Sequence, residues 1–432
     1  MTSITLPPAL LFENVRLLDA ASGLDRPDAR LLVRDGRIEA IDPAGELPAG
    51  IERLDGGGAV LCPGLVDMRV SIGEPGAEYR ETVSSAARAA ASGGITTIAV
   101  LPNTEPVIDD PALVRLLRAR GEETGAVTVL PYGAVTKGCR GEELAELGLL
   151  REAGAVAFTD GVRAVADARV MRLALSYARG FGATVTQHPE DPALGRGGSA
   201  TEGELATRLG LPGIPAAAEA ILVARDLRLA RLSGGRLHIA HVSTAEAVAL
   251  IRDAKRNGIA VSCDTAPPYF DLNETAIGDF RTYAKLSPPL RPESDRLAIC
   301  EALADGTIDA IASDHTPRDP DDKRLPFAQA SAGGIGLQTL LGVTLARVHD
   351  GTLPLPRAIE LLTAAPARLL GLETGTLRPG AAADLCLFDP ERAWRVAAGQ
   401  LPGRAQNTPF DGRALEGRVL GTWKNGRRVF GT

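Results

Sequence analysis

The 432-residue chain is predicted to be an α/β protein: an eight-stranded (β/α)8 TIM barrel with a small β-sandwich domain built from both termini. Three observations predict this architecture. Eight short apolar runs alternate with Ala-, Leu- and Arg-rich helical stretches, which favours a barrel over an open sheet. Both ends of the chain lack helical periodicity and carry short strand-like runs. The length suits a barrel with an appendage. We expect residues 62–375 to form the barrel and residues 1–61 and 376–432 the small domain.

The terminal segments are predicted to contribute strands because their apolar residues alternate or form short runs between Asp-Gly and Gly-Gly turns. Near the C-terminus, Asn425-Gly426 is a typical two-residue hairpin turn. The two ends are expected to meet in one domain, since chain termini often lie close together. The segments concerned are 10–19, 29–42, 52–64, 383–390 and 417–432.

The barrel prediction rests on eight β-type runs, each followed by a helical or loop segment of suitable length. One helical segment, residues 81–94, ends on Gly93-Gly94, as a helix C-cap requires. The runs span residues 64–71, 96–102, 127–133, 155–160, 184–188, 237–241, 259–264 and 308–314.

Barrel chemistry occurs at the C-terminal ends of the strands. Asp160, His188, His241 and Asp314 all end predicted strands, and together they have the right chemistry for Zn²⁺ or a similar divalent ion. Taken singly, each has an ordinary structural alternative, as a hydrogen-bonded core histidine or a helix N-cap. Of the other histidines, His238 is expected to be structural, His315 to support a ligand and His349 to end a surface helix.

Composition excludes several classes of protein. The net charge is −7 without a basic block, so no nucleic-acid partner is expected. We expect no membrane association, since no signal-peptide pattern or bilayer-length apolar run is present. The five cysteines are scattered without C-x-x-C spacing, which favours a reduced cytoplasmic protein. A homo-oligomer is expected.

Motifs along nearly the whole chain resemble those of the dihydroorotases, specifically the long bacterial type within the amidohydrolase superfamily. They include PGLVDMRV, EPG, GGITTIAVLPNTEPVID, AFTDG, LGLPGIPAAAE, LHIAHVSTAEAV, KLSPPLR, IASDHTP and NTPFDG. The resemblance implies a barrel of the amidohydrolase type. In that family two metal ions polarise the amide and activate a bridging water. Carried across, Asp160 is the bridging ligand, His188 and His241 hold the second metal, Asp314 shuttles the proton and Asn103 contacts the substrate carboxylate.

The chain departs from the family at the first metal site. Arg69 and Ser71 stand where the family carries His-x-His, and neither can replace a histidine ligand. Gly73 stands where the family has an arginine that grips the substrate, a loss worth on the order of 2–5 kcal/mol. Further departures are Arg318 for a histidine, Ser287 for an asparagine, and Pro267 and Pro268 in the region of the family's Thr-Pro-His-His.

Arg69 has three predicted positions. Its guanidinium can fork onto the site carboxylates, Asp314 in particular, which would lower the pKa of that aspartate and make it a poor base. It can instead pair with Asp67, or point away from the site.

Two functions therefore stay open. The first is a non-catalytic dihydroorotase-like protein of pyrimidine biosynthesis that supports aspartate transcarbamoylase, as some family members without metal ligands do. The second is a cyclic amidohydrolase using one Zn²⁺ or other divalent ion at Asp160, His188 and His241, with Asp314 as base. A two-metal centre is not expected. An ordinary dihydroorotase and a purely structural barrel are the remaining alternatives.

Overall fold

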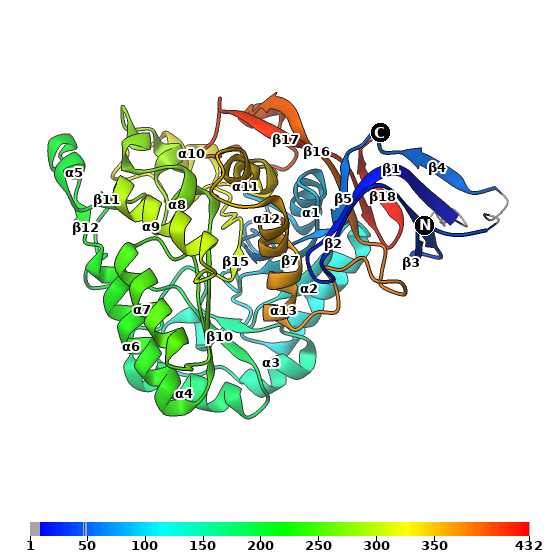
Figure 1. The fold of residues 1–432 in the computed structure, drawn as a ribbon. Helices are drawn as coiled ribbons and strands as arrows, with labels where there is room; N and C mark the ends of the chain where they lie inside the picture. The colour runs from blue at the N-terminus through cyan, green and yellow to red at the C-terminus, as the bar shows by residue number, and fades with distance from the viewer. Residues whose placement is uncertain (1–8, 46, 48–49, 432) are drawn as a thin grey trace.

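The computed structural model describes residues 9–45, 47 and 50–431. A barrel ringed by helices forms the larger part of the molecule, and a separate sheet lies to one side of it (Figure 1). Both ends of the described chain lie in that sheet. The predicted barrel with a small β-domain made from both termini is therefore confirmed.

The sheet domain is one eight-stranded hydrogen-bonded sheet. Its order is β18-β17-β16-β5-β1-β2-β3, and β4 pairs with β1. Antiparallel pairing of β5 with β16, with Cys62 opposite Cys386, joins the N-terminal strands to the C-terminal ones. The strands are β1 (Ala9–Asp19), β2 (Leu24–Arg34), β3 (Arg37–Ile41), β4 (Glu52–Asp55), β5 (Val60–Pro63), β16 (Leu385–Arg395), β17 (Ala414–Lys424) and β18 (Arg427–Gly431).

The predicted hairpin turn at Asn425-Gly426 joins β17 to β18. Both residues have positive φ, 49° and 73°, as a type I′ turn requires. Lys424 pairs with Arg427 directly across the turn. Asn and Gly tolerate this left-handed conformation, so the local sequence fixes the register of the last strand.

All eight predicted barrel runs contain a strand. Parallel pairing gives two arcs, β6-β7-β8 and β15-β14-β13-β10-β9. Isolated parallel bridges from Gly133 to Phe158 and from Val70 to His315 join the arcs and close the barrel. The strands are β6 (Leu65–Val70), β7 (Ile95–Val100), β8 (Thr128–Pro131), β9 (Phe158–Thr159), β10 (Thr184–Gln187), β13 (Arg236–Ile239), β14 (Val261–Thr265) and β15 (Ala310–Ile311).

Helices follow the barrel strands and cover the outside of the barrel (Figure 1). Several begin at a side-chain cap, such as Thr82, Asp110, Asp167 and Thr244, which satisfies a free amide of the first turn. The longer helices are α1 (Val83–Ser92), α2 (Pro111–Thr124), α3 (Leu147–Ala153), α4 (Ala168–Arg179), α6 (Ala217–Ser233), α7 (Ala245–Arg256), α9 (Glu293–Ala304), α11 (Leu340–His349), α12 (Leu355–Leu362) and α13 (Ala364–Leu370).

Short elements lie in the loops between these helices and strands. They are α5 (Glu204–Leu209), α8 (Pro267–Asp271) and α10 (Pro320–Arg324), the two-residue strands β11 (Ala200–Thr201) and β12 (Gly213–Ile214), and the 3-10 turns η1 (Lys137–Cys139), η2 (Glu274–Ile277), η3 (Thr282–Ala284) and η4 (Ala398–Gln400).

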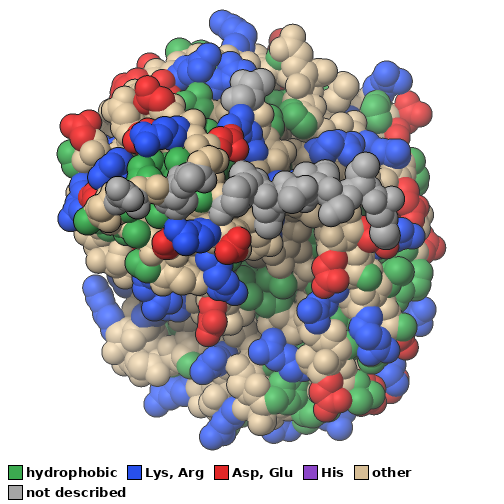
Figure 2. All heavy atoms as spheres, turned by 90° about the vertical axis from the view of Figure 1, so that its right-hand side faces the viewer, with side chains coloured by type: hydrophobic (Ala, Val, Ile, Leu, Met, Phe, Trp, Pro, Cys, Tyr) green, Lys and Arg blue, Asp and Glu red, His purple; other side chains and the backbone are tan. Residues whose placement is uncertain are grey.

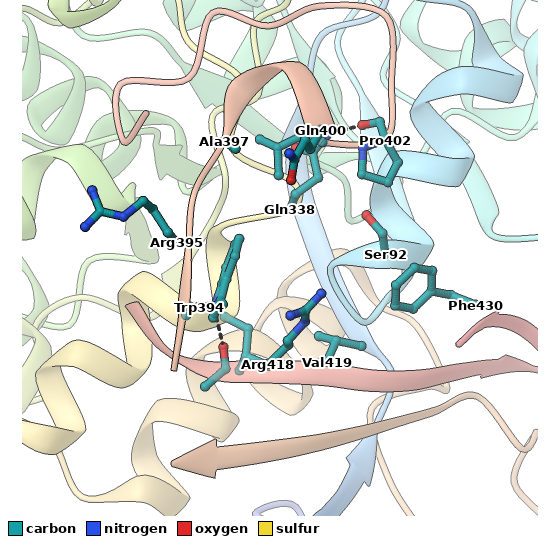
Figure 3. Close-up of a pocket in the computed structure, with 14 residues that line it drawn as sticks. Ser92, Gln338, Trp394, Arg395, Ala397, Gln400, Pro402, Arg418, Val419 and Phe430 are labelled. Carbon is teal, nitrogen blue, oxygen red and sulfur yellow. Dashed lines mark hydrogen bonds between the residues drawn. The ribbon is translucent and has the colours of Figure 1, made fainter. Parts of the chain in front are cut away.

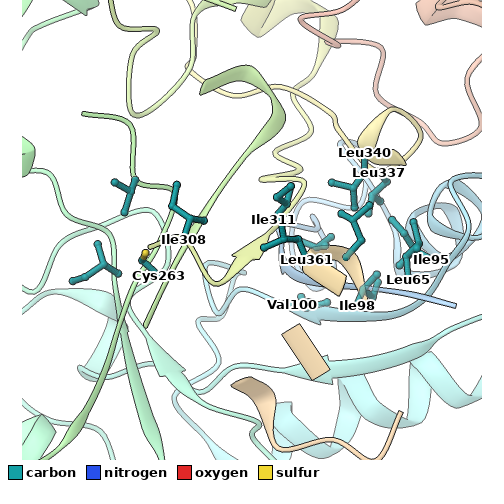
Figure 4. Close-up of a cluster of buried hydrophobic side chains, with 14 of the residues drawn as sticks. Leu65, Ile95, Ile98, Val100, Cys263, Ile308, Ile311, Leu337, Leu340 and Leu361 are labelled. Carbon is teal, nitrogen blue, oxygen red and sulfur yellow. The ribbon is translucent and has the colours of Figure 1, made fainter. Parts of the chain in front are cut away.

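The main core packs aliphatic side chains of the strands against the surrounding helices. Figure 4 shows part of it, where Leu65, Ile98 and Ile311 from three strands lie near Leu340 and Leu361 from the helices. The same core continues into the sheet domain through β5, β16 and β17. The two domains therefore share buried apolar surface.

The outer face of the sheet domain mixes charges of both signs. Figure 2 shows basic, acidic and apolar side chains interspersed over this face. Within the described part of the chain, no helix combines the length and the apolarity needed to cross a membrane. All five cysteines are buried and none forms a disulfide.

Candidate active site

Three of the predicted site residues meet at the C-terminal ends of the strands. His188 follows β10, His241 follows β13 and Asp314 follows β15. His188 Nδ1 lies 2.7 Å from His241 Nε2, and His241 Nδ1 lies 3.2 Å from Asp314 Oδ2. Both imidazoles are buried, while Asp314 keeps 15% of its side chain exposed. These side chains form a continuous polar chain across the barrel mouth.

Arg69 joins this chain from β6. Its Nε donates to Asp314 Oδ1 at 2.8 Å, and one terminal nitrogen donates to the Gly161 carbonyl at 3.2 Å. The side chain is only 2% exposed, and its other terminal nitrogen has no hydrogen-bond partner. Asp67 accepts from the Arg69 backbone amide, not from the guanidinium. Of the three predicted positions, the structure has the pairing with Asp314.

His241 and Asp314 share a strained backbone conformation. Their φ angles are +37° and +52°, in the left-handed region that is uncommon for residues other than Gly, although Asn, Asp and His enter it more often than most. Such residues cost about 1–3 kcal/mol each and persist where the surrounding structure over-determines them. The surrounding barrel therefore fixes the backbone of these two residues.

Asp160 follows β9 but does not join the His188–His241 pair. One carboxylate oxygen accepts the backbone amides of Val135 and Thr136, each at 2.9 Å, and the other accepts the Thr136 hydroxyl. Among the described residues, no hydrogen bond or ion pair links Asp160 to either histidine. Asp160 thus fastens the loop after β8 to the end of β9.

Asn103, the predicted substrate contact, holds the adjacent turn. Its Nδ2 donates to the Asp160 carbonyl and its Oδ1 accepts the Val162 amide, each at 3.0 Å. A Cβ atom on the intervening Gly161 would lie 1.6 Å from Asn103 Oδ1. One amide hydrogen of Asn103 stays available for a ligand.

In this arrangement the predicted metal ligands are not assembled around one position. Two histidine nitrogens bound to one tetrahedral ion at about 2.0–2.1 Å lie about 3.3 Å apart. His188 and His241 are closer than this and hydrogen-bond to each other. Asp160 already accepts hydrogen bonds from three donors, and the Arg69 guanidinium donates to Asp314. Among the described residues, the one group of three or more His, Cys, Asp or Glu residues whose ligand atoms all lie within 4.8 Å of one another is elsewhere, at His349, Glu391 and Glu416.

The site's ionisable groups have shifted pKa values. Burial lowers the pKa of His188 well below its ordinary value, and His241 and Arg69 add to this effect, so the imidazole is neutral. Burial alone would raise the pKa of Asp314, but His241 and Arg69 outweigh it and leave that pKa below its ordinary value. Burial raises the pKa of Asp67 to about 6, because its Oδ2 is buried without a partner.

The loop after β6 folds tightly around Gly73, where the resemblance implies that a family arginine is absent. Gly73 donates to the Glu81 carbonyl and accepts from the Ala77 amide. A Cβ atom at Gly73 would lie 1.9 Å from the Ala77 carbonyl oxygen, so no larger residue fits without moving the loop. Ser71, which follows Arg69 by two residues, has a buried hydroxyl without a partner.

The remaining histidines lie apart from the polar chain. His238 bridges β13 to β14 through Ser262 at 2.8 Å and Asp264 at 2.9 Å, a structural role as predicted. His315 is fully buried and contacts Glu81 at 3.8 Å, not a site residue. His349 ends α11 at the surface, also as predicted.

Asp264 is a site residue that sequence reasoning left without a role. Its Oδ1 accepts the His241 backbone amide at 2.7 Å, while its Oδ2 contacts His238. It thereby holds the strained backbone of His241. Its position at the end of a predicted strand was the available signal.

The molecule has cavities at the barrel mouth and at the domain junction. One of about 730 Å³ opens beside His188, with Glu190 and Arg163 in its wall, and one of about 230 Å³ lies beside Ser71. A third, of about 280 Å³, lies between α11 and the sheet domain (Figure 3), where Trp394 and Arg418 face Gln338. Only the first two border the strand ends.

Comparison with known proteins identifies the family. A family model described as dihydro-orotase-like matches residues 58–247. The dihydroorotase of Pelobacter propionicus is 46% identical over 421 residues, covering 98% of this chain and 99% of the relative. That of Citrifermentans bemidjiense is 42% identical with the same coverage. Among solved structures, the L-hydantoinase (dihydropyrimidinase) of Arthrobacter aurescens superposes with a TM-score of 0.86 at 27% identity, covering 98% of this chain and 96% of its own. The chain therefore belongs to the dihydroorotase family.

Proposed function

We propose that this chain is a dihydroorotase-family protein of pyrimidine biosynthesis that does not hydrolyse dihydroorotate and instead supports aspartate transcarbamoylase as a non-catalytic partner. The observation that carries the loss of catalysis is the buried contact between Arg69 Nε and Asp314 Oδ1 at 2.8 Å. A permanent cation lies where the family's first metal is expected, bound to the carboxylate expected to shuttle the proton.

This contact opposes proton transfer. A general base works best when its pKa lies near the operating pH. Asp314 has a lowered pKa and is bonded on both sides, to Arg69 and to His241. The carboxylate is therefore a weak base without a free oxygen directed at a water molecule.

Water activation and substrate binding lack their expected residues as well. Arg69 and Ser71 supply no ligand for a metal that would lower the pKa of water. Asp160 is held by Val135 and Thr136. Gly73 lies in a loop with no room for an arginine.

The partner is supported by the family resemblance and by the loss of the catalytic residues, since a retained barrel without chemistry needs another use. The test combines a dihydroorotate hydrolysis assay, with and without added Zn²⁺, and co-purification with aspartate transcarbamoylase from the same source. We expect no turnover and one co-eluting peak. Turnover at an ordinary enzymatic rate, or separate elution of the two proteins, contradicts the proposal.

A variant that restores both histidines tests whether the absent metal ligands alone account for the proposed loss of activity. The double change Arg69→His with Ser71→His returns the His-x-His motif. We expect it to recover metal binding without dihydroorotate turnover, because Gly73 and the fastened Asp160 are unchanged. Turnover by the double variant would show that only the two ligands were missing.

One observation favours the alternative, a cyclic amidohydrolase with a single divalent metal ion. His188 and His241 remain side by side and buried, with positive φ retained at His241. Family members bind divalent metals, and ligation of one ion requires these two nitrogens to move apart from 2.7 Å to about 3.3 Å. This alternative requires close to one metal per chain, lost in His188→Ala. Protein that stays metal-free after Zn²⁺ addition excludes it.

A further inference from the structure

The cavity at the domain junction lies apart from the barrel mouth and has no part in the proposed function. It has a volume of about 280 Å³ and is lined by residues of α1 and α11 on the barrel side and of β16 and β17 on the side of the sheet domain. Its lining combines an aromatic ring, a guanidinium group and a buried amide (Figure 3). A ligand bound there would contact both domains at once.

The lining of this cavity is positively charged, although the net charge of the chain is −7. The described residues that line it include two arginines and no acidic residue. Arg395 donates to the Gly412 carbonyl at 2.9 Å and points away from the other lining side chains in Figure 3. Arg418 is exposed, and within the described chain its guanidinium makes neither a hydrogen bond nor an ion pair. Its paired N–H groups are therefore free to hold an anion at the mouth of the cavity.

Trp394 provides an aromatic wall whose orientation is fixed. Its indole Nε1 donates to the Gly417 carbonyl of β17 at 2.9 Å, and the ring is half-buried. Because this hydrogen bond already orders the ring, a flat ligand that stacks on it does not have to immobilise the side chain. Phe430 and Leu401 add apolar surface to the same cavity. Nucleobases of every kind stack on aromatic side chains, since each base has a π-face.

Gln338 brings an unsatisfied hydrogen-bond acceptor to the lining. Its side chain is only 8% exposed, and its Nε2 donates to the Pro402 carbonyl. Its Oε1 is buried and has no partner among the described residues. Buried amide oxygens without a donor are uncommon in folded proteins. An N–H group of a bound ring would supply the donor that Oε1 lacks.

We propose that this cavity binds a nucleoside monophosphate with a single-ring base. The base stacks on Trp394 and donates an N–H to Gln338 Oε1, while the phosphate lies at the mouth against Arg418. A guanidinium group matches phosphate through paired hydrogen bonds. The volume is below the about 300–1,000 Å³ typical of drug-sized ligands, which favours a single ring over a purine. Binding needs neither metal nor turnover, and the site goes beyond the proposed scaffold function.

Calorimetric titration of the purified full-length chain with UMP tests this site. Uridine, which lacks the phosphate, and ribose phosphate, which lacks the base, are the controls, and AMP tests the size of the base. We expect UMP to bind and to raise the melting temperature, and both controls to bind more weakly by about tenfold or more. No binding of UMP, equal binding of either control, or tighter binding of AMP than of UMP overturns the assignment.

Matched variants show whether the polar lining residues are responsible. We expect Arg418→Gln, which removes the anion contact, and Gln338→Met, which removes the acceptor, each to weaken UMP binding by about tenfold. The control is Arg427→Gln, since Arg427 is exposed on the neighbouring strand β18 and is not among the described residues that line the cavity. An equal loss in this control would show that only net charge matters and would overturn the proposal.

Trp394 is tested by its fluorescence as well as by substitution. A base stacked on Trp394 should quench its emission, whereas Trp423 is buried against Phe12 and should not respond. We expect UMP to quench the unmodified chain. In Trp394→Phe, which keeps a ring, binding should persist without quenching, and Trp394→Leu, which keeps only apolar bulk, should bind much more weakly. Equal binding by the Phe and Leu variants would contradict stacking.

Each variant is first checked by circular dichroism and thermal unfolding, so that a folding defect is recognised. Should Gln338→Met fail to fold, UMP methylated at its ring N–H tests the same hydrogen bond on the unmodified chain, and binding as tight as that of UMP would contradict it. Failure of UMP binding leaves the proposed non-catalytic function intact, because that function is tested by turnover and co-purification. Dihydroorotate turnover by the unmodified chain would contradict the proposed function without deciding this site.

Discussion

At the scale of single residues, Arg69 supplies a positive charge beside the Asp314 carboxylate. Asp314 is mostly buried and would be costly to ionise alone. The guanidinium supplies the positive charge and a direct hydrogen bond at 2.8 Å. The pair is therefore expected to matter for folding whether or not the protein has an activity.

A double-mutant cycle measures this coupling. We expect Arg69→Met to destabilise the protein by about 3–5 kcal/mol, because it leaves the mostly buried Asp314 carboxylate without its arginine partner. Adding Asp314→Asn should recover part of that loss, with a coupling on the order of 0.5–3 kcal/mol. Urea unfolding of the four proteins gives the values. As a control, the same cycle on the exposed pair Arg324 and Asp321 should show no measurable coupling. If the effects of Arg69→Met and Asp314→Asn simply add, the Arg69–Asp314 pair does not contribute to folding stability.

Asp67 is expected to lower the free energy of unfolding as the pH rises, whereas a carboxylate paired with a cation raises it. Its folded pKa is raised to about 6 from an ordinary 3.8. A raised pKa contributes stability that is present below pH 4 and is lost as the pH rises through 6, a change of about 3 kcal/mol for two pKa units. Asparagine cannot ionise. We therefore expect the free energy of unfolding of Asp67→Asn, relative to that of the unmodified protein, to rise by this amount between pH 4 and pH 7. Urea unfolding of both proteins at several pH values measures this difference in unfolding free energy. A difference that stays constant across the range would mean that Asp67 does not titrate there.

At the scale of elements, the loop after β6 has adapted to glycine at position 73. The Gly73–Glu81 and Ala77–Gly73 backbone hydrogen bonds fold the loop against itself. A side chain at position 73 would therefore collide with the loop as it is folded here. The substitution and the loop conformation therefore belong together.

Substitutions of glycine test this closure. We expect Gly73→Ala to destabilise the protein by about 1–3 kcal/mol, the usual cost of overpacking, because its Cβ would lie 1.9 Å from a carbonyl oxygen. Gly399→Ala is the control, since a Cβ there meets no atom within 4 Å. Thermal unfolding of both variants gives the comparison. Equal melting temperatures would mean that the loop moves freely.

At the scale of the whole molecule, the sequence predicts the barrel because the strand pattern is regular. It also predicts that His188, His241 and Asp314 meet, since parallel strand ends converge at one face. It does not predict the direction of Asp160, which depends on Val135 and Thr136 in a loop after another strand. Nor does the sequence predict how the loop folds around Gly73, because a glycine places no side-chain constraint on the backbone conformation of its loop.

The shared core predicts that the barrel and the sheet domain unfold together. Cys62, Phe388 and Leu415 of the sheet belong to the same buried cluster as Leu341 and Leu345 of α11. Domains joined by a large apolar interface are not expected to move or unfold independently. Both tryptophans lie in the sheet domain, whereas the α-helices of the described chain lie between residues 83 and 370.

Two spectroscopic probes can therefore follow the two domains separately. In the variant Trp394→Phe, fluorescence reports only Trp423, which is buried against Phe12 inside the sheet domain. Far-UV circular dichroism at the helix band reports the barrel. We expect the two urea transitions to coincide, because unfolding either part exposes the apolar surface of the other. A fluorescence transition at clearly lower urea than the helical one would mean that the sheet domain unfolds alone and that the shared core contributes little to its stability.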